Sequence, residues 1–68
     1  MTCATVNAEC RRRGYPERLY RHPRGPYYYW VGNPTLHSTI VDGVSSLRGV
    51  SVDDLLDDLH QKRDASGG

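Results

Sequence analysis

Apolar residues recur at helical spacing near both ends of the chain. Cys3, Val6 and Cys10 lie three and four positions apart, so they share one face of a short helix predicted over Ala4–Arg13. Gly14 follows at a position where a left-handed residue commonly ends a helix. The first element is therefore expected to be a short helix with one apolar face.

A second helix is predicted from Ser51 to about Arg63. Ser51 is a favoured N-cap residue, and Val50 before it can pack on Leu55 as a hydrophobic staple. The apolar stripe of this helix consists of Val52, Leu55, Leu56 and Leu59. Four aspartates lie mostly away from the stripe, and we call them the acidic face: Asp53, Asp54, Asp57 and Asp58.

Between the helices the pattern changes to that of a β-hairpin. Strands are predicted over Glu17–His22 and Tyr27–Val31, because proline and glycine in the residues between them are typical of a turn. Side chains alternate between the two faces of a strand. Alternation would place Tyr28 and Trp30 on one face of the second strand, and Tyr27, Tyr29 and Val31 on the other.

A third strand is predicted from His37 or Ser38 to Val44, centred on the β-branched pair Ile40 and Val41. The order of elements predicts an α+β fold: an N-terminal helix, a three-stranded antiparallel sheet and a C-terminal helix packed on one face. We expect one small domain over residues 1–63 and a disordered tail over 64–68.

Length and composition limit what such a domain can do. The chain has 68 residues, with no Phe, one Trp and five Tyr, so its large apolar side chains are mostly tyrosines. Domains of this size have thin cores and are often stabilised by a partner subunit. A homodimer is therefore one expectation.

No apolar run approaches the ~20 residues that span a bilayer, so no membrane partner is expected. The N-terminus lacks the basic start and apolar stretch of a secretory signal. These features predict a cytoplasmic protein.

Charge is unevenly distributed along the chain although the net charge is only +1. Residues 1–34 carry six arginines and two glutamates, whereas residues 35–68 carry three basic and six acidic residues. A basic half and an acidic half are typical of proteins with two binding faces or with head-to-tail self-association.

Residues that could perform catalysis are scattered. The candidate metal ligands lack paired spacing such as CxxC or HxxxH: Cys3, Cys10, His22, His37 and His60. No glycine-rich phosphate loop is present, and the chain has little room for a substrate pocket. We expect no enzymatic activity, no cofactor and no metal.

Two groups of residues are candidates for binding. The first, for a protein partner, combines the aromatic strand with the acidic face: Tyr27, Tyr29, Trp30, Asp53, Asp54, Asp57 and Asp58. The second, for DNA, combines arginines with tyrosines, because arginines hold phosphates while aromatic rings stack on bases: Arg18, Tyr20, Arg21, Arg24 and Tyr28. Both groups also have a purely structural interpretation. The aspartates can be a solvated helix face, and the tyrosines can fill a core that lacks phenylalanine while the arginines end a helix and flank the hairpin.

Two resemblances add to this interpretation. The motifs Val6-Asn7-Ala8, Tyr27-Tyr28-Tyr29-Trp30 and Ser46-Leu47, with the helix that follows, resemble small uncharacterised accessory proteins of proteobacterial plasmids, integrative elements and prophages. This resemblance implies a mobile-element protein that regulates or inhibits a host system.

The segment from Pro16 to Trp30 is similar to the arm-type DNA-binding domain of phage tyrosine integrases, which presents a three-stranded sheet to DNA.

The leading hypothesis from the sequence as a whole is a non-enzymatic accessory protein that binds a protein partner. A small DNA-binding module that uses the hairpin is the alternative.

Overall fold

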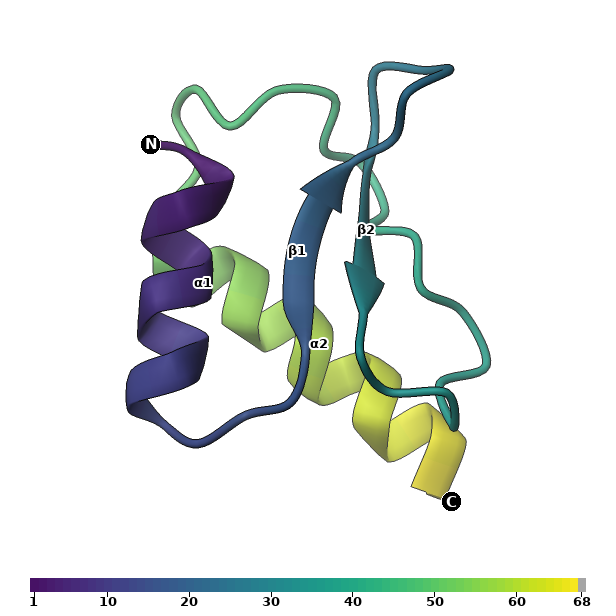
Figure 1. Cartoon of the computed structure of the whole chain (residues 1–68). Coiled ribbons are helices and arrows are strands. Elements are labelled where there is room, and N and C mark those ends of the chain that lie inside the picture. The colour runs from purple at the N-terminus through teal and green to yellow at the C-terminus, as the bar shows by residue number, and fades with distance from the viewer. Residues whose placement is uncertain (68) are drawn as a thin grey trace.

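Two helices and one antiparallel hairpin form the regular structure of residues 1–67, the part of the chain that this computed structural model describes (Figure 1). Their order is α1 (Cys3–Arg12), β1 (Arg18–Arg21), β2 (Tyr28–Val31) and α2 (Val52–Gly67). The predicted α+β class is confirmed. The sheet, however, has two strands rather than the predicted three.

The predicted C-terminal cap of α1 is present. The N–H of Tyr15 donates to the carbonyl oxygen of Cys10 at 2.9 Å. The N–H of Gly14 donates to the carbonyl oxygen of Arg11 at 3.1 Å. These two bonds form a Schellman motif, which satisfies carbonyls that the end of a helix leaves unpaired. Val6 and Cys10 are buried, as the helical spacing predicts.

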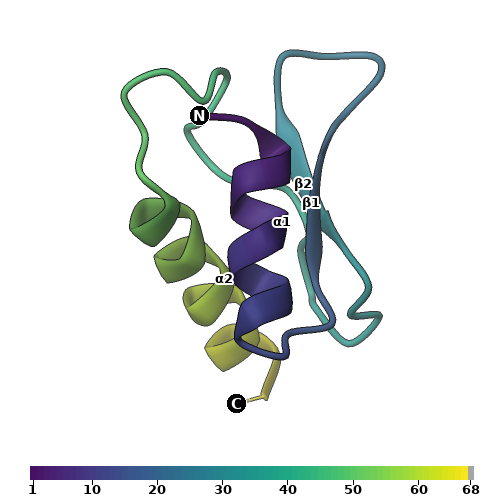
Figure 2. The same ribbon diagram turned by 60° about the vertical axis from the view of Figure 1, so that its left-hand side comes forward.

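The hairpin has the alternation that the sequence predicts. Leu19 pairs with Trp30 and Tyr20 with Tyr29 across the two strands. Leu19 and Trp30 are buried, and so is Tyr28 on the same face. Both helices lie on this side of the hairpin, and neither α1 nor α2 covers the other side (Figure 2).

The predicted third strand is reduced to one bridge between Tyr29 and Ile40. Two backbone hydrogen bonds hold this bridge. The Trp30 N–H donates to the Thr39 carbonyl at 2.8 Å, and the Val41 N–H donates to the Tyr28 carbonyl at 2.9 Å. The chain then turns at Gly43, whose φ of +75° lies in the left-handed region. An extended strand cannot pass through that conformation, so the strand predicted to reach Val44 is wrong.

The N-terminal cap of α2 is a reciprocal capping box. Asp54 N–H donates to Ser51 Oγ at 3.1 Å, and Ser51 N–H donates to the Asp54 carboxylate at 3.2 Å. The predicted stripe faces the core, with Leu55, Leu56 and Leu59 buried beside Leu19 and Trp30: these five residues belong to one apolar cluster.

The end of α2 differs from the prediction of a disordered tail over residues 64–68. The helix continues to Gly67, and Ser66 Oγ accepts a hydrogen bond from the His37 N–H at 2.8 Å. This long-range contact holds the last turn against the loop after β2. Residue 68 lies outside the described residues. No helix within residues 1–67 has the length and apolar character needed to cross a membrane.

Candidate binding surface on the uncovered sheet face

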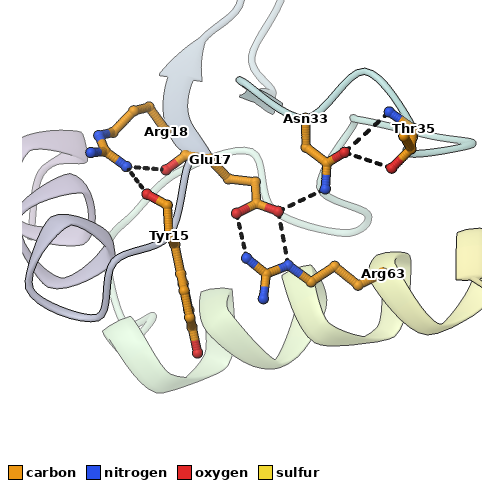
Figure 3. A network of polar contacts seen from close by, with 6 residues as sticks. All are labelled: Tyr15, Glu17, Arg18, Asn33, Thr35 and Arg63. Carbon is orange, nitrogen blue, oxygen red and sulfur yellow. Dashed lines mark hydrogen bonds and ion pairs between the residues drawn. The ribbon is translucent and has the colours of Figure 1, made fainter.

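A buried ion pair fixes the base of the hairpin on α2 (Figure 3). Glu17, immediately before β1, is fully buried and receives two hydrogen bonds from the Arg63 guanidinium, of which the Nε bond is 2.8 Å long. Asn33 Nδ2 donates to the same carboxylate at 2.9 Å. Burial alone would raise the pKa of Glu17, but these hydrogen bonds lower it from 4.5 to about 2.

Further contacts around this ion pair hold the two ends of the hairpin together. The Arg63 guanidinium lies 4.3 Å from the centre of the Tyr15 ring, in cation–π geometry. Gly32, directly after β2, approaches the chain at Pro16 so closely that a Cβ would stand 2.4 Å from the Pro16 carbonyl oxygen. Only glycine fits there. The hairpin is therefore anchored rigidly at its base.

The free edge of β1 is covered by a side chain of α1. Asn7 Nδ2 donates to the Leu19 carbonyl at 3.0 Å, and the Leu19 N–H donates to Asn7 Oδ1 at 2.6 Å. These two bonds replace those that a neighbouring strand would make at Leu19. Exposed strand edges are prone to pairing with other chains, and Asn7 blocks this one.

The side of the hairpin opposite the helices carries a cluster of partly exposed aromatic and aliphatic side chains, which we call the uncovered face: Tyr20, His22, Tyr27, Tyr29, Val31 and Ile40. Among these, Tyr20 is 49% exposed, Ile40 45% and Val31 42%. They are three of the most exposed large hydrophobic residues that the structure describes. Monomeric proteins rarely leave such residues clustered without a function.

Ring contacts order the uncovered face. His22 stacks on Tyr27 with 4.5 Å between ring centres, and its edge meets Tyr29 at 5.6 Å. Tyr20 and Tyr29 face each other across the strands at 6.3 Å. Such aromatic pairs have preferred geometries and stabilise each other beyond the area that they bury. The rings of the uncovered face are therefore held in place by one another.

Two shallow hollows interrupt the uncovered face. One, of about 370 Å³, is lined by His22, Pro23, Tyr27, Tyr29, Thr39 and Ile40. The other, of about 450 Å³, is lined by Pro26, Tyr27 and residues 40–45. Both are lined in part by Tyr27 and Ile40, so they are neighbours on the surface.

Charges of both signs lie near the uncovered face, because Asp42, which is 89% exposed, lines the hollow of about 450 Å³. The stretch from Arg18 to Val41 contains three arginines and no aspartate or glutamate. Arg21 and Arg24 are exposed and have no carboxylate partner among residues 1–67, but Arg21 pairs with the buried Tyr28 and so belongs to the helix-covered face of the hairpin. Arg18 instead donates to two backbone carbonyls, those of Tyr15 and Glu17.

Of the residues predicted to contact a protein partner through the aromatic strand, the structure places two on the uncovered face. These are Tyr27 and Tyr29, both partly buried. The prediction that Trp30 contacts a partner is corrected by the structure, because its side chain is 1% exposed and lies in the core. Its Nε1–H donates to the Asp58 carboxylate of α2 at 3.1 Å, so the polar atom of the ring is also bonded within the chain.

The predicted acidic face is divided by contacts within the chain. Asp58 is held by Trp30 and by Lys62, whose Nζ lies 2.9 Å from its carboxylate. Asp54 belongs to the capping box at the start of α2. Only Asp53 and Asp57 remain exposed without such contacts, so the four aspartates do not form one free surface.

The residues predicted to bind DNA are also divided. Tyr28 belongs to the core and is 9% exposed, whereas Arg18 is half-buried and donates to two backbone carbonyls. Tyr20, Arg21 and Arg24 are exposed. Sequence reasoning missed His22 and Ile40, although the position of His22 two residues after Tyr20 already places both side chains on one face of a strand.

The described residues contain neither a cluster of metal ligands nor a thiol with a lowered pKa. Within residues 1–67, no three His, Cys, Asp or Glu side chains gather closely enough to hold a metal ion. Burial raises the pKa of the Cys3 and Cys10 thiols, which keeps both in the unreactive protonated form near neutral pH.

Comparison with known proteins gives no further guide to the site. No protein family model, curated protein or solved structure matches the chain. The functional argument therefore rests on the surface geometry.

Proposed function

We propose that this chain is a non-enzymatic binding protein that recognises a protein partner through the uncovered face. The observation that carries the proposal is the exposure of Tyr20, Val31 and Ile40 beside an ordered set of aromatic rings. Aromatic side chains are enriched in the cores of protein interfaces, where they supply much of the binding energy. The resemblance to accessory proteins of mobile elements supports a role as regulator or inhibitor of a host system.

The test compares capture of partners by three immobilised proteins from a nuclease-treated proteobacterial lysate. These are the unaltered chain, a Tyr20→Ser/Ile40→Ser variant and a control with Asp53→Lys and Asp57→Lys on α2. We expect a protein that the unaltered chain and the control both retain and that the Tyr20→Ser/Ile40→Ser variant loses at least tenfold. If all three proteins retain the partner equally, and circular dichroism shows each to be folded, the partner does not bind through the uncovered face.

The second candidate function is DNA binding by the tip of the hairpin. Arg21 and Arg24 are exposed near the turn of the hairpin, and no acidic side chain lies between residues 18 and 41 in the sequence. Fluorescence anisotropy of a labelled DNA duplex, titrated at low and near-physiological salt, tests this candidate. DNA would be favoured over a protein if binding weakens steeply with salt. The Arg24→Gln variant should then show a smaller slope of log affinity against log salt concentration.

A further inference from the structure

The loop that joins the two strands of the hairpin, residues 23–26, is held by one side chain. Two of its four residues are prolines, which have no backbone N–H to donate. The His22 N–H donates to the Tyr27 carbonyl at 2.9 Å and closes the loop. Within the loop, the Arg24 N–H donates to His22 Nδ1 at 3.1 Å. No other hydrogen bond of the loop occurs among residues 1–67.

The loop borders the two hollows of the uncovered face. The His22 ring stacks on the Tyr27 ring, with 4.5 Å between their centres and 25° between their planes. The Tyr27 ring also lies against Gly25, where a Cβ would stand 2.5 Å from Tyr27 Cε1. Pro23 lines one hollow and Pro26 lines the other. The position of the loop therefore sets the shape of both hollows.

The hydrogen bond from Arg24 assigns the protonation state of His22. Nδ1 can accept a hydrogen bond only while it carries no proton, so His22 is neutral with its proton on Nε2. Both nitrogens of a protonated imidazole are donors, and the Arg24 N–H would then face a second donor. Histidine is the side chain that ordinarily changes charge between about pH 5 and pH 8. Weak acid therefore breaks this hydrogen bond.

No acidic side chain pairs with His22. None of the ion pairs among residues 1–67 includes it. Asp42 lines the neighbouring hollow, and its carboxylate lies 3.7 Å from Lys62 Nζ. Arg24 in the loop has the same sign of charge as a protonated His22. A proton on His22 would thus gain no ion pair in exchange for the lost hydrogen bond.

The rings next to His22 keep their places when it is protonated. A cation is attracted to the face of a tyrosine ring, so the stack on Tyr27 survives. The ladder between β1 and β2 does not involve the imidazole. The titratable side chains on this face of the two strands are tyrosines, and the segment bridged to β2 adds only uncharged residues to the same hollow: Tyr20, Tyr27, Tyr29, Thr39 and Ile40. Protonation therefore releases the loop and not the strands.

We infer that His22 is a proton-sensitive latch of the hairpin. Neutral His22 holds the Arg24 backbone, and with it residues 23–26. Protonated His22 releases the loop, which changes both hollows and leaves the strands paired. The uncovered face thus has one shape at neutral pH and another in weak acid. The latch is a property of the free chain and does not depend on the proposed function.

Nuclear magnetic resonance of the isotope-labelled full chain tests the latch directly. We expect a coupling through the hydrogen bond between the Arg24 amide nitrogen and His22 Nδ1 at about pH 8, and its loss at about pH 5. The Arg24 amide resonance should shift with pH along the same curve as the His22 ring. Absence of the coupling at the higher pH would overturn the latch. A His22 ring that titrates without a shift of the Arg24 amide would overturn it too.

Two substitutions separate the acceptor from the ring. His22→Asn keeps an acceptor, because an asparagine side chain can bond to the N–H two residues on, and it does not titrate. Its Arg24 amide resonance should stay constant over the same pH range. His22→Phe keeps a ring to stack on Tyr27 but has no acceptor, so its Arg24 and Gly25 amides should be mobile at both pH values. The control His37→Gln replaces another exposed histidine and should keep the full pH response. A response that persists in His22→Asn, or disappears in His37→Gln, would contradict the latch.

Relaxation of the amide nitrogens measures how far the release extends. In weak acid the Arg24 and Gly25 amides should gain fast motion, whereas those of Tyr20 and Tyr29, which pair across the strands, should not. The anchor at the base of the hairpin stays intact, since the pKa of Glu17 is about 2. Motion that spreads into the strands would mean that acid melts the hairpin instead of opening a latch. A loop that stays rigid in weak acid would also refute it.

Discussion

The two faces of the hairpin have similar side chains but different surroundings. On the inner face, Trp30 is 1% exposed and its ring nitrogen is bonded to Asp58 of α2. On the outer face, Tyr20 is 49% exposed although it too belongs to a ring pair, with Tyr29. Aromatic character therefore does not by itself identify a binding surface in this molecule. What distinguishes the outer face is that neither α1 nor α2 covers it (Figure 2).

The largest expected loss of stability is that of Trp30→Ala, which removes the central side chain of the inner face. Removal of a fully buried aromatic side chain costs about 3–5 kcal/mol, and a domain of this size has only about 3–10 kcal/mol of stability in total. Urea denaturation followed by circular dichroism should find the variant largely unfolded. A variant as stable as the unaltered chain would contradict the assignment of Trp30 to the core.

Arg63→Met should have the next largest effect, because it leaves the Glu17 carboxylate buried without its cation. Breaking such a pair costs about 3 kcal/mol or more. The control is Arg12→Met, which removes an exposed arginine paired with Glu9 on α1 and should change the urea midpoint little. If the two substitutions have equal effects, the buried ion pair does not anchor the hairpin.

Acid should weaken the anchored base of the hairpin through Glu17. The pKa of Glu17 is lowered on folding from 4.5 to about 2, so its contribution to stability is full above pH 4.5 and is lost as pH falls toward 2. Between neutral pH and pH 3 this loss is about 2 kcal/mol. Urea denaturation at several pH values checks it, and a Glu17→Gln variant should lose less stability over the same window.

The smallest effect on stability is expected at the uncovered face. Tyr20→Ser and Ile40→Ser change side chains about half exposed, and surface substitutions of this kind usually stay within about 0.5 kcal/mol. The thermal midpoints of both variants should lie close to that of the unaltered chain. A large loss of stability would mean that the uncovered face supports the fold rather than a partner.

The sequence predicts well those features that depend on neighbouring residues. The period of two in β2 separates Tyr28 and Trp30 from Tyr27 and Tyr29, and Ser51 identifies the start of α2. Periodicity gives the residues that share a face but not which face the helices cover. For that reason Trp30 was predicted to contact a partner, although it lies in the core.

Features that depend on distant contacts were not predictable. Asp58 forms part of an exposed helix face in the sequence, and its partner Trp30 lies 28 residues away. The last turn of α2 is held by a hydrogen bond from His37 to Ser66, 29 residues apart. The predicted third strand does not reach Val44 for a local reason, because the chain turns at Gly43, whose φ is +75°.

The most direct test of the account is site-specific photo-crosslinking in cells that produce the protein. A photoreactive phenylalanine analogue replaces Tyr20 on the uncovered face in one version and the exposed Asp57 on α2 in the other. We predict a discrete crosslinked protein from position 20 and none from position 57. A crosslinked partner from position 57 alone would show that the functional surface is the helical side and would contradict the central claim.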